Sequence, residues 1–425
     1  MTVNIKISRY NAKLDIADLT FIVFFSSTVI SVVLSKVFGF MHISRFATPF
    51  FLWGLTFLFV LCLIKYSLKR WLNSVVLYFG IVLLFLVSYI ITPELAEWYS
   101  NSSWGLAYRV FRIDRGLYAF FAILLVREPK KILRNLKIVG FIWTPYLIWQ
   151  AVQRIQLGYF IVTENDGITT SKSLYTLSYG YNAVFIGLIF FMIYKKNKNK
   201  IYLALGWMLC CLAITFGSRG SLIVLGCYFL IWELLKLRTD LSKQRIIRTF
   251  LLICLVVIVV PFYDYIIAAL GSVLESIGIQ SRTLQSLLSS AISDTNGREK
   301  IWGAAIEQIN RYFPLGAGAF GDRLSAGKVL AWGYCHSIIL EMLASFGLVG
   351  AIVLCVMVNK SIKIIVSDMD YELVNLFVLF FSCSIKLLIS DSFWYNAHFW
   401  GALALAYLYK MRTKELQQQE CSENA

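Results

Sequence analysis

Residues 72–92, LNSVVLYFGIVLLFLVSYIIT, form an apolar run that contains no Asp, Glu, Lys or Arg. As a helix, a run of this length spans the hydrocarbon core of a bilayer. Similar runs recur from Leu19 to Tyr409, and the 425-residue chain is 59% hydrophobic and 15% charged, with a mean hydropathy of +0.70. Average soluble domains are about a quarter charged. The composition therefore excludes a soluble enzyme and predicts an all-α, polytopic integral membrane protein.

The apolar runs predict about twelve transmembrane helices within a single integral membrane domain, residues 1–425. The expected spans are 19–38, 47–64, 72–92, 107–126, 137–153, 174–194, 201–216, 220–235, 249–268, 338–358, 371–390 and 394–410. Between the ninth and tenth helices, residues 269–337 are expected to form a large extracytoplasmic loop. Two short helices near Ser281–Ile292 and Glu299–Tyr312 would make this loop an ordered lid on the membrane surface. The polar end, residues 411–425, is expected to be a disordered cytoplasmic tail.

The basic residues indicate how the chain is oriented in the membrane. A net charge of +16 could suggest a nucleic-acid partner. However, Lys and Arg are concentrated in alternate connections: residues 195–200 hold several lysines, whereas residues 93–106 hold no basic residue. This alternation is the positive-inside pattern, and it places both termini in the cytoplasm. The basic excess is therefore a topology signal, and no nucleic-acid partner is expected.

Three arginines contradict this pattern at the outer end of the fourth span. Arg109, Arg112 and Arg115 recur every three residues, a spacing that places neighbours on one face of a helix. Guanidinium groups that faced lipid would be costly. They could lie in the headgroup layer or pair with Asp114. Alternatively, they converge on an anionic ligand, because the planar guanidinium binds phosphate oxygens bidentately.

Other charged residues are expected on the same outer side. Arg219 lies in a short turn before the eighth span, and Arg298 lies in the large loop. Lys386 and Asp391 lie near the outer end of the eleventh span. Pyrophosphate is a natural ligand for such a group, since one anion can neutralise several guanidiniums.

Histidine is scarce, and His336 has the most distinctive position. It lies where the large loop ends and the tenth span begins, whereas His42 and His398 are expected to be structural. An imidazole can take a proton from a sugar hydroxyl near neutral pH. Cys335 is not expected to act with it as a thiol nucleophile, because adjacent helical residues point about 100° apart. With few histidines and scattered carboxylates, we expect no zinc or di-metal site and no cofactor, although one or two carboxylates would suffice for a magnesium site.

Gly316, Gly318 and Gly321 spell GxGxxG, a dinucleotide-binding pattern. That pattern functions between a strand and a helix of a βαβ unit. No strand is expected before it, and the loop is expected to face away from cytoplasmic nucleotides. The glycines are therefore predicted to shape a turn.

Three motifs together resemble the O-antigen polymerase and O-antigen ligase superfamily of bacterial envelope glycosyltransferases. His336-Ser337, nine residues and then Gly347-Leu-Val-Gly350 match its H-[N/S/Q]-x9-G-x-x-G pattern. Asn296–Trp302 followed by Pro314–Gly318 is similar to its arginine–tryptophan and P-x-G-x-G run. The turn Gly217-Ser-Arg-Gly220 is similar to its S-R-G turn. These motifs cover residues 217–350, and their order strengthens the resemblance.

The resemblance implies a metal-independent glycosyltransferase at the outer face of the bacterial cytoplasmic membrane. Such enzymes transfer a glycan from an undecaprenyl-pyrophosphate carrier to a hydroxyl of an acceptor. His336 would be the general base, and Arg219 and Arg298 would hold the pyrophosphate. Adding Arg109, Arg112 and Arg115 to the pyrophosphate site rests on their spacing alone. The expected partners are the undecaprenyl-pyrophosphate-linked oligosaccharide, membrane lipid and a chain-length regulator.

Within this superfamily we expect a polymerase of O-antigen or capsule repeat units, with a lipid-linked repeat unit as the acceptor. A ligase of the same fold, with a lipid A core or a protein as acceptor, is an alternative that the motifs do not separate. A flippase or transporter is a third hypothesis. Transporters usually have matching halves with interrupted helices. The sequence shows no such repeat, and its outer ionisable residues are expected near one face.

Overall fold

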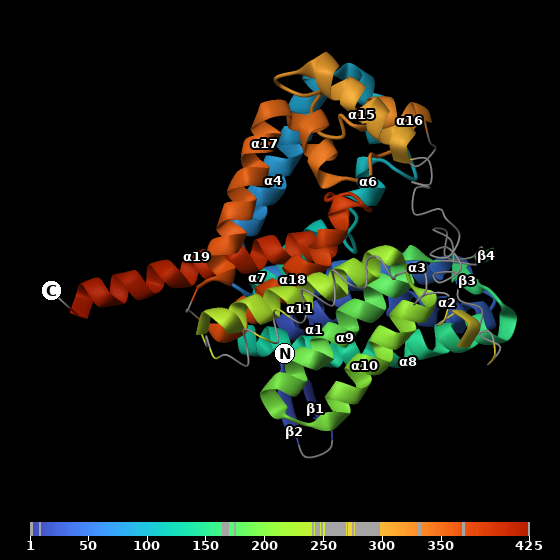
Figure 1. Cartoon of the computed structure of the whole chain (residues 1–425), viewed down its shortest axis with the longest axis vertical. Helices are drawn as coiled ribbons and strands as arrows, with labels where there is room; N and C mark the ends of the chain where they lie inside the picture. The colour runs from blue at the N-terminus through green and yellow to red at the C-terminus, as the bar shows by residue number, and fades with distance from the viewer. Residues whose placement is uncertain are drawn as a thin grey trace. The chain divides into compact units, whose positions relative to one another are not determined.

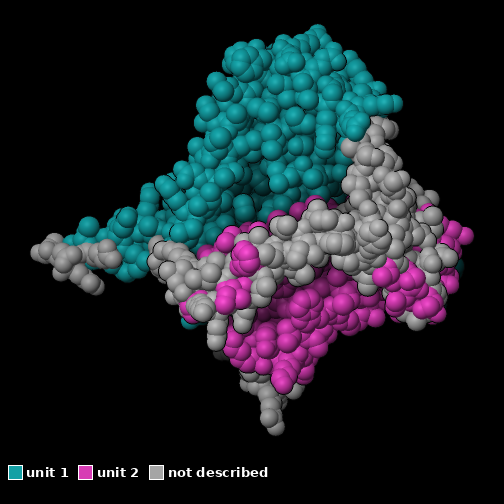
Figure 2. Space-filling view, in the orientation of Figure 1, with its two compact units in different colours: residues 1–139, 297–425 teal, residues 140–296 magenta. Residues whose placement is uncertain are grey.

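The structure is a computed structural model that describes residues 3–7, 10–163, 170–173, 176–239, 298–329, 333–367 and 370–423, with isolated residues between 242 and 276. Its internal contacts divide the chain into two compact units, coloured separately in Figure 2. Unit 1 combines the two ends of the chain, Met1–Val139 and Gly297–Ala425. Unit 2 is the middle segment, Gly140–Asn296. His336 therefore lies in a unit that is built from segments far apart in sequence.

Unit 1 is built around the short helix α7, which is buried on every side. An α-helix that is apolar all round lies either in a protein core or in lipid, and α7 lies in the core because it packs against α1, α4 and α19. α18 in turn packs against α19 (Figure 1). The α-helices of the first segment are α1 (Ile16–Phe25), α2 (Ser27–Phe40), α3 (Ala47–Lys65), α4 (Leu68–Ile91), α5 (Ala96–Ser100), α6 (Leu106–Arg109) and α7 (Leu117–Val126). Those of the second segment are α15 (Arg298–Tyr312), α16 (Arg323–Val329), α17 (Ile338–Ile365), α18 (Tyr371–Ser384) and α19 (Ala397–Glu423).

Unit 2 is centred on α9 (Leu177–Asn197), which packs against α10 (Lys200–Phe216) and α11 (Arg219–Thr239). The long helix α8 (Pro129–Leu157) begins in unit 1 and continues into unit 2. At the end of α9, Lys198 adopts a left-handed conformation, and Asn199 then caps α10 through its side chain. This tight turn returns the chain antiparallel to α9.

Two short β-hairpins depart from the all-α prediction. β1 (Val3–Ile7) pairs antiparallel with β2 (Tyr10–Leu14), with Ile5 opposite Ala12. β3 (Phe160–Thr163) pairs antiparallel with β4 (Thr170–Ser173), with Val162 opposite Ser171. Both sheets are two-stranded, so the fold remains helical in character.

Several helices have the length and composition needed to cross a membrane. Among the described residues these are Ser44–Lys65, Arg70–Ile91, Leu177–Asn197, Ile338–Ile365 and Tyr371–Leu388. α1 and α2, which are bent by 77° relative to each other, make a sixth if they form one broken span. These helices support an integral membrane protein of the all-α class. The twelve-helix count stays a prediction, and both the expected ninth span and the expected helix Ser281–Ile292 lie outside the described residues.

The structure also corrects the sequence analysis in the fourth span and in the C-terminal tail. The expected fourth span, 107–126, is not one helix: α6 ends at Arg109, and α7 begins only at Leu117. The segment between them packs so closely that a Cβ on Gly116 would lie 2.5 Å from the Tyr395 carbonyl oxygen. The expected disordered tail is also helical, because α19 continues without a break to Glu423.

Candidate functional site

The glycine-rich loop that follows α15 docks onto a break in α17. The break is at Gly347, whose backbone has φ 53° and ψ −132°. In an unbroken helix the Leu348 N–H would bond to the Ala344 carbonyl. Instead it donates to the Pro314 carbonyl at 2.8 Å, and Ala344 accepts from the Ala317 N–H at 2.9 Å. The loop thus satisfies the backbone groups that the break leaves without helical partners.

Glycine is needed at this junction because the two backbones nearly touch. A Cβ on Gly347 would lie 2.0 Å from the Pro314 carbonyl oxygen, and one on Gly316 would lie 2.5 Å from the Ser345 carbonyl oxygen. Gly316 and Gly318 also have positive φ angles, of 80° and 90°, which glycine adopts readily. The prediction that these glycines shape a turn is confirmed. The P-L-G-A-G run and the G-L-V-G run are two sides of one contact.

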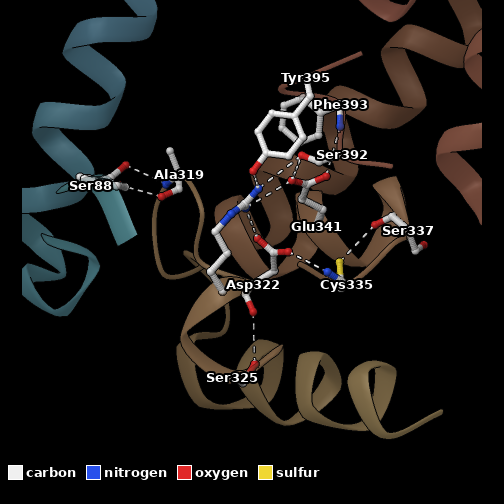
Figure 3. Close-up of polar contacts among 12 residues, drawn as sticks. Ser88, Ala319, Asp322, Ser325, Cys335, Ser337, Glu341, Ser392, Phe393 and Tyr395 are labelled. Atoms are coloured by element: carbon white, nitrogen blue, oxygen red, sulfur yellow. Dashed lines mark hydrogen bonds and ion pairs between the residues drawn. The ribbon is translucent and has the colours of Figure 1, made fainter. Parts of the chain in front are cut away.

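The loop is also anchored to α4 and to the segment that follows it. The Ala319 N–H donates to the Ser88 hydroxyl oxygen at 2.8 Å (Figure 3). The Tyr99 hydroxyl donates to the Ala319 carbonyl at 2.7 Å. Phe320, which is fully buried, makes an edge contact with Phe85 of α4. These contacts fix the chain directly before Asp322 and Arg323.

His336 lies between this loop and the start of α17, and the backbone around it is held on both sides. The Cys335 N–H donates to Asp322 Oδ2 at 3.0 Å, and the Cys335 carbonyl accepts from Trp302 Nε1 at 3.1 Å. His336 itself has φ 54°, a left-handed conformation that is uncommon for a residue with a side chain. Ser337 is extended at the N-cap of α17. The direction of the imidazole is therefore set by fixed neighbours.

The surroundings of His336 keep its imidazole neutral. Burial and the positive charge of Arg298 lower its pKa to about 4, although Asp391 opposes them. Within the described part of the chain, its Nδ1 atom is buried and has no hydrogen-bond partner. The Tyr334 ring packs against the imidazole, with 4.2 Å between the ring centroids. A neutral imidazole retains the lone pair that a general base needs.

Arg109, Arg112 and Arg115 gather around one aromatic side chain, not along a helical face. Their guanidinium carbons lie 5.2, 4.2 and 4.8 Å from the centre of the Tyr108 ring. Only Arg109 belongs to a helix, so the helical spacing argument was wrong. The segment is irregular because its polar side chains bond to groups within the segment. Arg112 forms a bidentate pair with Asp114, at 2.6 and 2.9 Å. Arg115 Nε donates to the Tyr108 carbonyl at 3.1 Å.

Arg109 differs from the other two arginines because its partners lie towards His336. Its guanidinium carbon is 3.9 Å from the centre of a Trp104 ring and 5.6 Å from that of Tyr395. Tyr395 makes an edge contact with Tyr334, the ring that packs on His336. The structure therefore places Arg298 in the electrostatic surroundings of His336, whereas Arg109 acts on the neighbouring Tyr334 and Tyr395 rings.

Asp391 and Lys386 add a charged pair to the same surroundings. Their Nζ and Oδ2 atoms are 3.0 Å apart. Burial would raise the pKa of Asp391, but Lys386 and hydrogen bonds from the Ser392 N–H and Asn396 outweigh it, so the pKa lies below its ordinary value. Asp391 is therefore ionised at neutral pH, and its interaction with His336 partly offsets that of Arg298.

Arg219 lies in unit 2, at the first position of α11. The turn before it packs tightly against α9: a Cβ on Gly180 would lie 2.6 Å from the Gly217 Cα atom. The close approach of these two glycines fixes where α11 begins. The predicted role of Arg219 in pyrophosphate binding stays a prediction.

The sequence analysis missed a group of buried polar side chains beside His336. Asp322, Arg323 and Glu341 are each at most 1% exposed, and Ser392 and Tyr395 also contact Arg323 (Figure 3). One signal was available: Glu341 is an ionisable residue inside an expected span, and such residues usually have a functional or paired role. In the part of the chain that is described, no group of three or more His, Cys, Asp or Glu could hold a metal ion.

These features define a helical integral membrane protein with a neutral, half-buried histidine at the start of an apolar helix and the positive charge of Arg298 in its surroundings. A family model described as O-antigen ligase matches residues 203–355, which include the Gly217–Gly220 turn, the glycine-rich loop and His336. This match confirms the resemblance to the O-antigen polymerase and ligase superfamily, and it supports a function of that general type. No curated protein and no solved structure matches the chain.

Proposed function

We propose that the protein is a polysaccharide polymerase. It would transfer a glycan from an undecaprenyl-pyrophosphate carrier to a sugar hydroxyl of a lipid-linked repeat unit, at the outer face of the cytoplasmic membrane. The observation that carries this proposal is the placement of His336: a neutral imidazole on a fixed backbone, with the cationic Arg298 in its surroundings. Both termini would be cytoplasmic, as the positive-inside pattern predicts.

The proposed reaction is a single displacement at the anomeric carbon. His336 takes the proton of the acceptor hydroxyl as its oxygen bonds to the anomeric carbon, and the bond from that carbon to the phosphate oxygen breaks. Undecaprenyl pyrophosphate leaves with the bonding electrons, and the anomeric configuration is inverted. A positioned base of this kind contributes about 10²–10⁴ to a rate.

The arginines would stabilise the leaving pyrophosphate. Arg298 and Arg219 would contact its oxygens, and Arg109, Arg112 and Arg115 would add positive potential around them. Because guanidinium groups supply the charge stabilisation, the proposed reaction needs no divalent metal. Binding would also activate the base: pyrophosphate would offset the charge of Arg298, one of the causes of the low pKa of His336.

A ligase is the second candidate, because the matching family model carries the description O-antigen ligase. The chemistry at the donor would be the same. Only the acceptor would differ, with a lipid A core or a protein in place of a lipid-linked repeat unit.

The first experiment is to delete the gene and separate the surface and lipid-linked glycans of the host by size. A polymerase mutant is expected to attach single repeat units to their normal anchor while the long ladder disappears. Full-length polymer that accumulates on the lipid carrier would identify a ligase and contradict the polymerase proposal. Repeat units confined to the cytoplasmic face would instead indicate a flippase. A chain-length regulator, our expected partner, should alter ladder length only in a strain that makes the ladder.

Replacing the pyrophosphate arginines by lysine is expected to impair turnover. Lysine keeps the positive charge but loses the planar fork, so we expect Arg298→Lys and Arg219→Lys each to lower transfer by about 10- to 100-fold. Arg311→Lys, on the same helix as Arg298, is the matched control. The measurement is the initial rate with lipid-linked oligosaccharide in proteoliposomes. Wild-type rates in both variants would exclude these arginines from the pyrophosphate site.

A further inference from the structure

The most unusual side chain in unit 1 is Arg323, a fully buried arginine at the start of α16. It is 1% exposed and lies directly beside Asp322, which is 0% exposed. Its Nη1 atom is 2.7 Å from Asp322 Oδ1 and 3.4 Å from Glu341 Oε1. Removing such charges from water costs several kcal/mol per ion. A replacement by apolar residues of similar size is often neutral or stabilising. Stability alone therefore does not explain why this buried group of charged side chains is present.

The Arg323 guanidinium makes contacts through both of its terminal nitrogens and through one of its flat faces. Its Nη2 atom donates to the Tyr395 hydroxyl oxygen at 2.7 Å and lies 3.4 Å from the Ser392 hydroxyl (Figure 3). One face of the guanidinium lies over the Phe320 ring, with 3.5 Å between its central carbon and the ring centre. A lysine ammonium could not occupy these positions together, because it is a compact point charge.

Glu341 closes the group on the side of α17. Its carboxylate accepts from the Ser392 hydroxyl at 2.5 Å and from the Phe393 N–H at 3.3 Å. It therefore ties the first turn of α17 to the segment before α19. The group joins the end of the glycine-rich loop, the start of α17 and the 392–395 segment, which are distant in sequence.

Two connections lead from Arg323 to His336. In the first, Asp322 holds Arg323 with one carboxylate oxygen and accepts the Cys335 N–H with the other, directly before His336. In the second, Tyr395 accepts from Arg323 and contacts the Tyr334 ring, which packs on the imidazole. One connection acts on the backbone of the histidine and the other on its ring.

We propose that Arg323 is a positioning residue that orients the His336 imidazole through Asp322 and Tyr395. The proposal rests on the proposed function, in which His336 is the general base. Arg323 itself touches no substrate. It keeps His336 in its left-handed backbone conformation and keeps the Tyr334 ring against the imidazole. A misplacement of about 1 Å at a reacting group can cost about 10²-fold in rate.

The test uses Arg323→Lys, Asp322→Asn and Tyr395→Phe in the full-length protein in proteoliposomes. Each variant removes one link while changing the volume little. We expect kcat to fall about 10- to 100-fold in each, with KM changed by less than about twofold. Arg134→Lys is the matched control. Arg134 pairs with the buried Asp18 at 2.6 Å, in a part of unit 1 that has no contact with His336 in the described structure.

A second measurement reports on His336 without requiring activity. Diethyl pyrocarbonate modifies neutral imidazole, and mass spectrometry can follow the modification of His336 as a function of pH. In the wild type the midpoint is expected near the pKa of His336, which is about 4. Burial and Arg298 lower this pKa, whereas Asp391, which is paired with Lys386, raises it. If the variants release the imidazole from the Tyr334 ring and expose it to water, the midpoint rises towards the ordinary value of about 6.5.

The outcomes separate this proposal from the proposed function. Folded variants with wild-type kcat and a wild-type His336 midpoint would overturn the positioning role, even if His336→Ala is inactive. An active His336→Ala would overturn the proposed function, and the modification midpoint would still decide whether Arg323 positions the imidazole. If Arg323→Lys does not fold, Tyr395→Phe decides, because it keeps the ring and removes only the hydroxyl that binds Arg323.

Discussion

His336→Ala is expected to abolish glycan transfer, with a loss of at least about 10²-fold, because no other described group replaces an imidazole as the base. The variant should insert into the membrane in normal amounts, since the hydrogen bonds that hold this region come from Cys335 and its partners, not from the His336 side chain. The measurement is transfer of lipid-linked oligosaccharide by purified protein in proteoliposomes. His42→Ala is the control, because His42 is an exposed histidine.

The pH dependence of kcat/KM gives a second check on the same residue, since this constant reports the ionisation of the free enzyme. The neutral imidazole is the active form. With a pKa of about 4, activity should be retained as the pH falls from 7 to 5 and should be lost as the pH falls through 4. An inflection near pH 6.5, together with an active His336→Ala, would contradict His336 as the base.

Gly347→Ala is expected to prevent correct folding of the junction between the glycine-rich loop and α17. The new methyl group would lie 2.0 Å from the Pro314 carbonyl oxygen, and the φ of 53° with ψ of −132° is outside the regions open to alanine. Strain and clash together should cost about 3 kcal/mol or more. The measurements are the yield of folded protein in the membrane and its melting temperature.

Gly303→Ala provides the matched control for this prediction. Gly303 lies inside α15, and a Cβ at that position would meet nothing within 4 Å. Alanine is a better helix former than glycine by up to about 1 kcal/mol, so this variant should be as stable as the wild type or slightly more stable. If Gly347→Ala melts at the same temperature as Gly303→Ala, the close docking of loop and helix is wrong.

The sequence predicted the class of fold well because long apolar runs have few alternatives to membrane helices. The expected helix Glu299–Tyr312 is confirmed almost residue for residue by α15. The fourth span was wrong because hydropathy does not register local solvation: the arginines and Asp114 satisfy one another and nearby carbonyls in an irregular segment. Likewise, the bend between α1 and α2 falls at Ser26-Ser27-Thr28, inside the run that was predicted as one span, because three small polar residues do not interrupt the average hydropathy of the run.

The residues of the candidate site that belong to short sequence motifs could be predicted. Those that only tertiary contacts bring together could not. His336, Arg298 and the two glycine runs were identified from short patterns. The group around Arg323 was not, because Arg323, Glu341 and Tyr395 come from different elements and only the folded chain brings them together. The contact between the two glycine runs is of the same kind: each run was visible, but their pairing was not.

The discontinuous construction of unit 1 has a consequence for biogenesis. α7, which ends at Val126, is covered by α19, which begins at Ala397, roughly 270 residues later. At a synthesis rate of about 5–20 residues per second, that interval is on the order of tens of seconds. During this time α7 lacks one of its partners, and the chain that carries His336 has yet to join it. The core of unit 1 is therefore completed only when synthesis is nearly finished, and a chain truncated before α19 would leave the side of α7 that α19 covers without its partner.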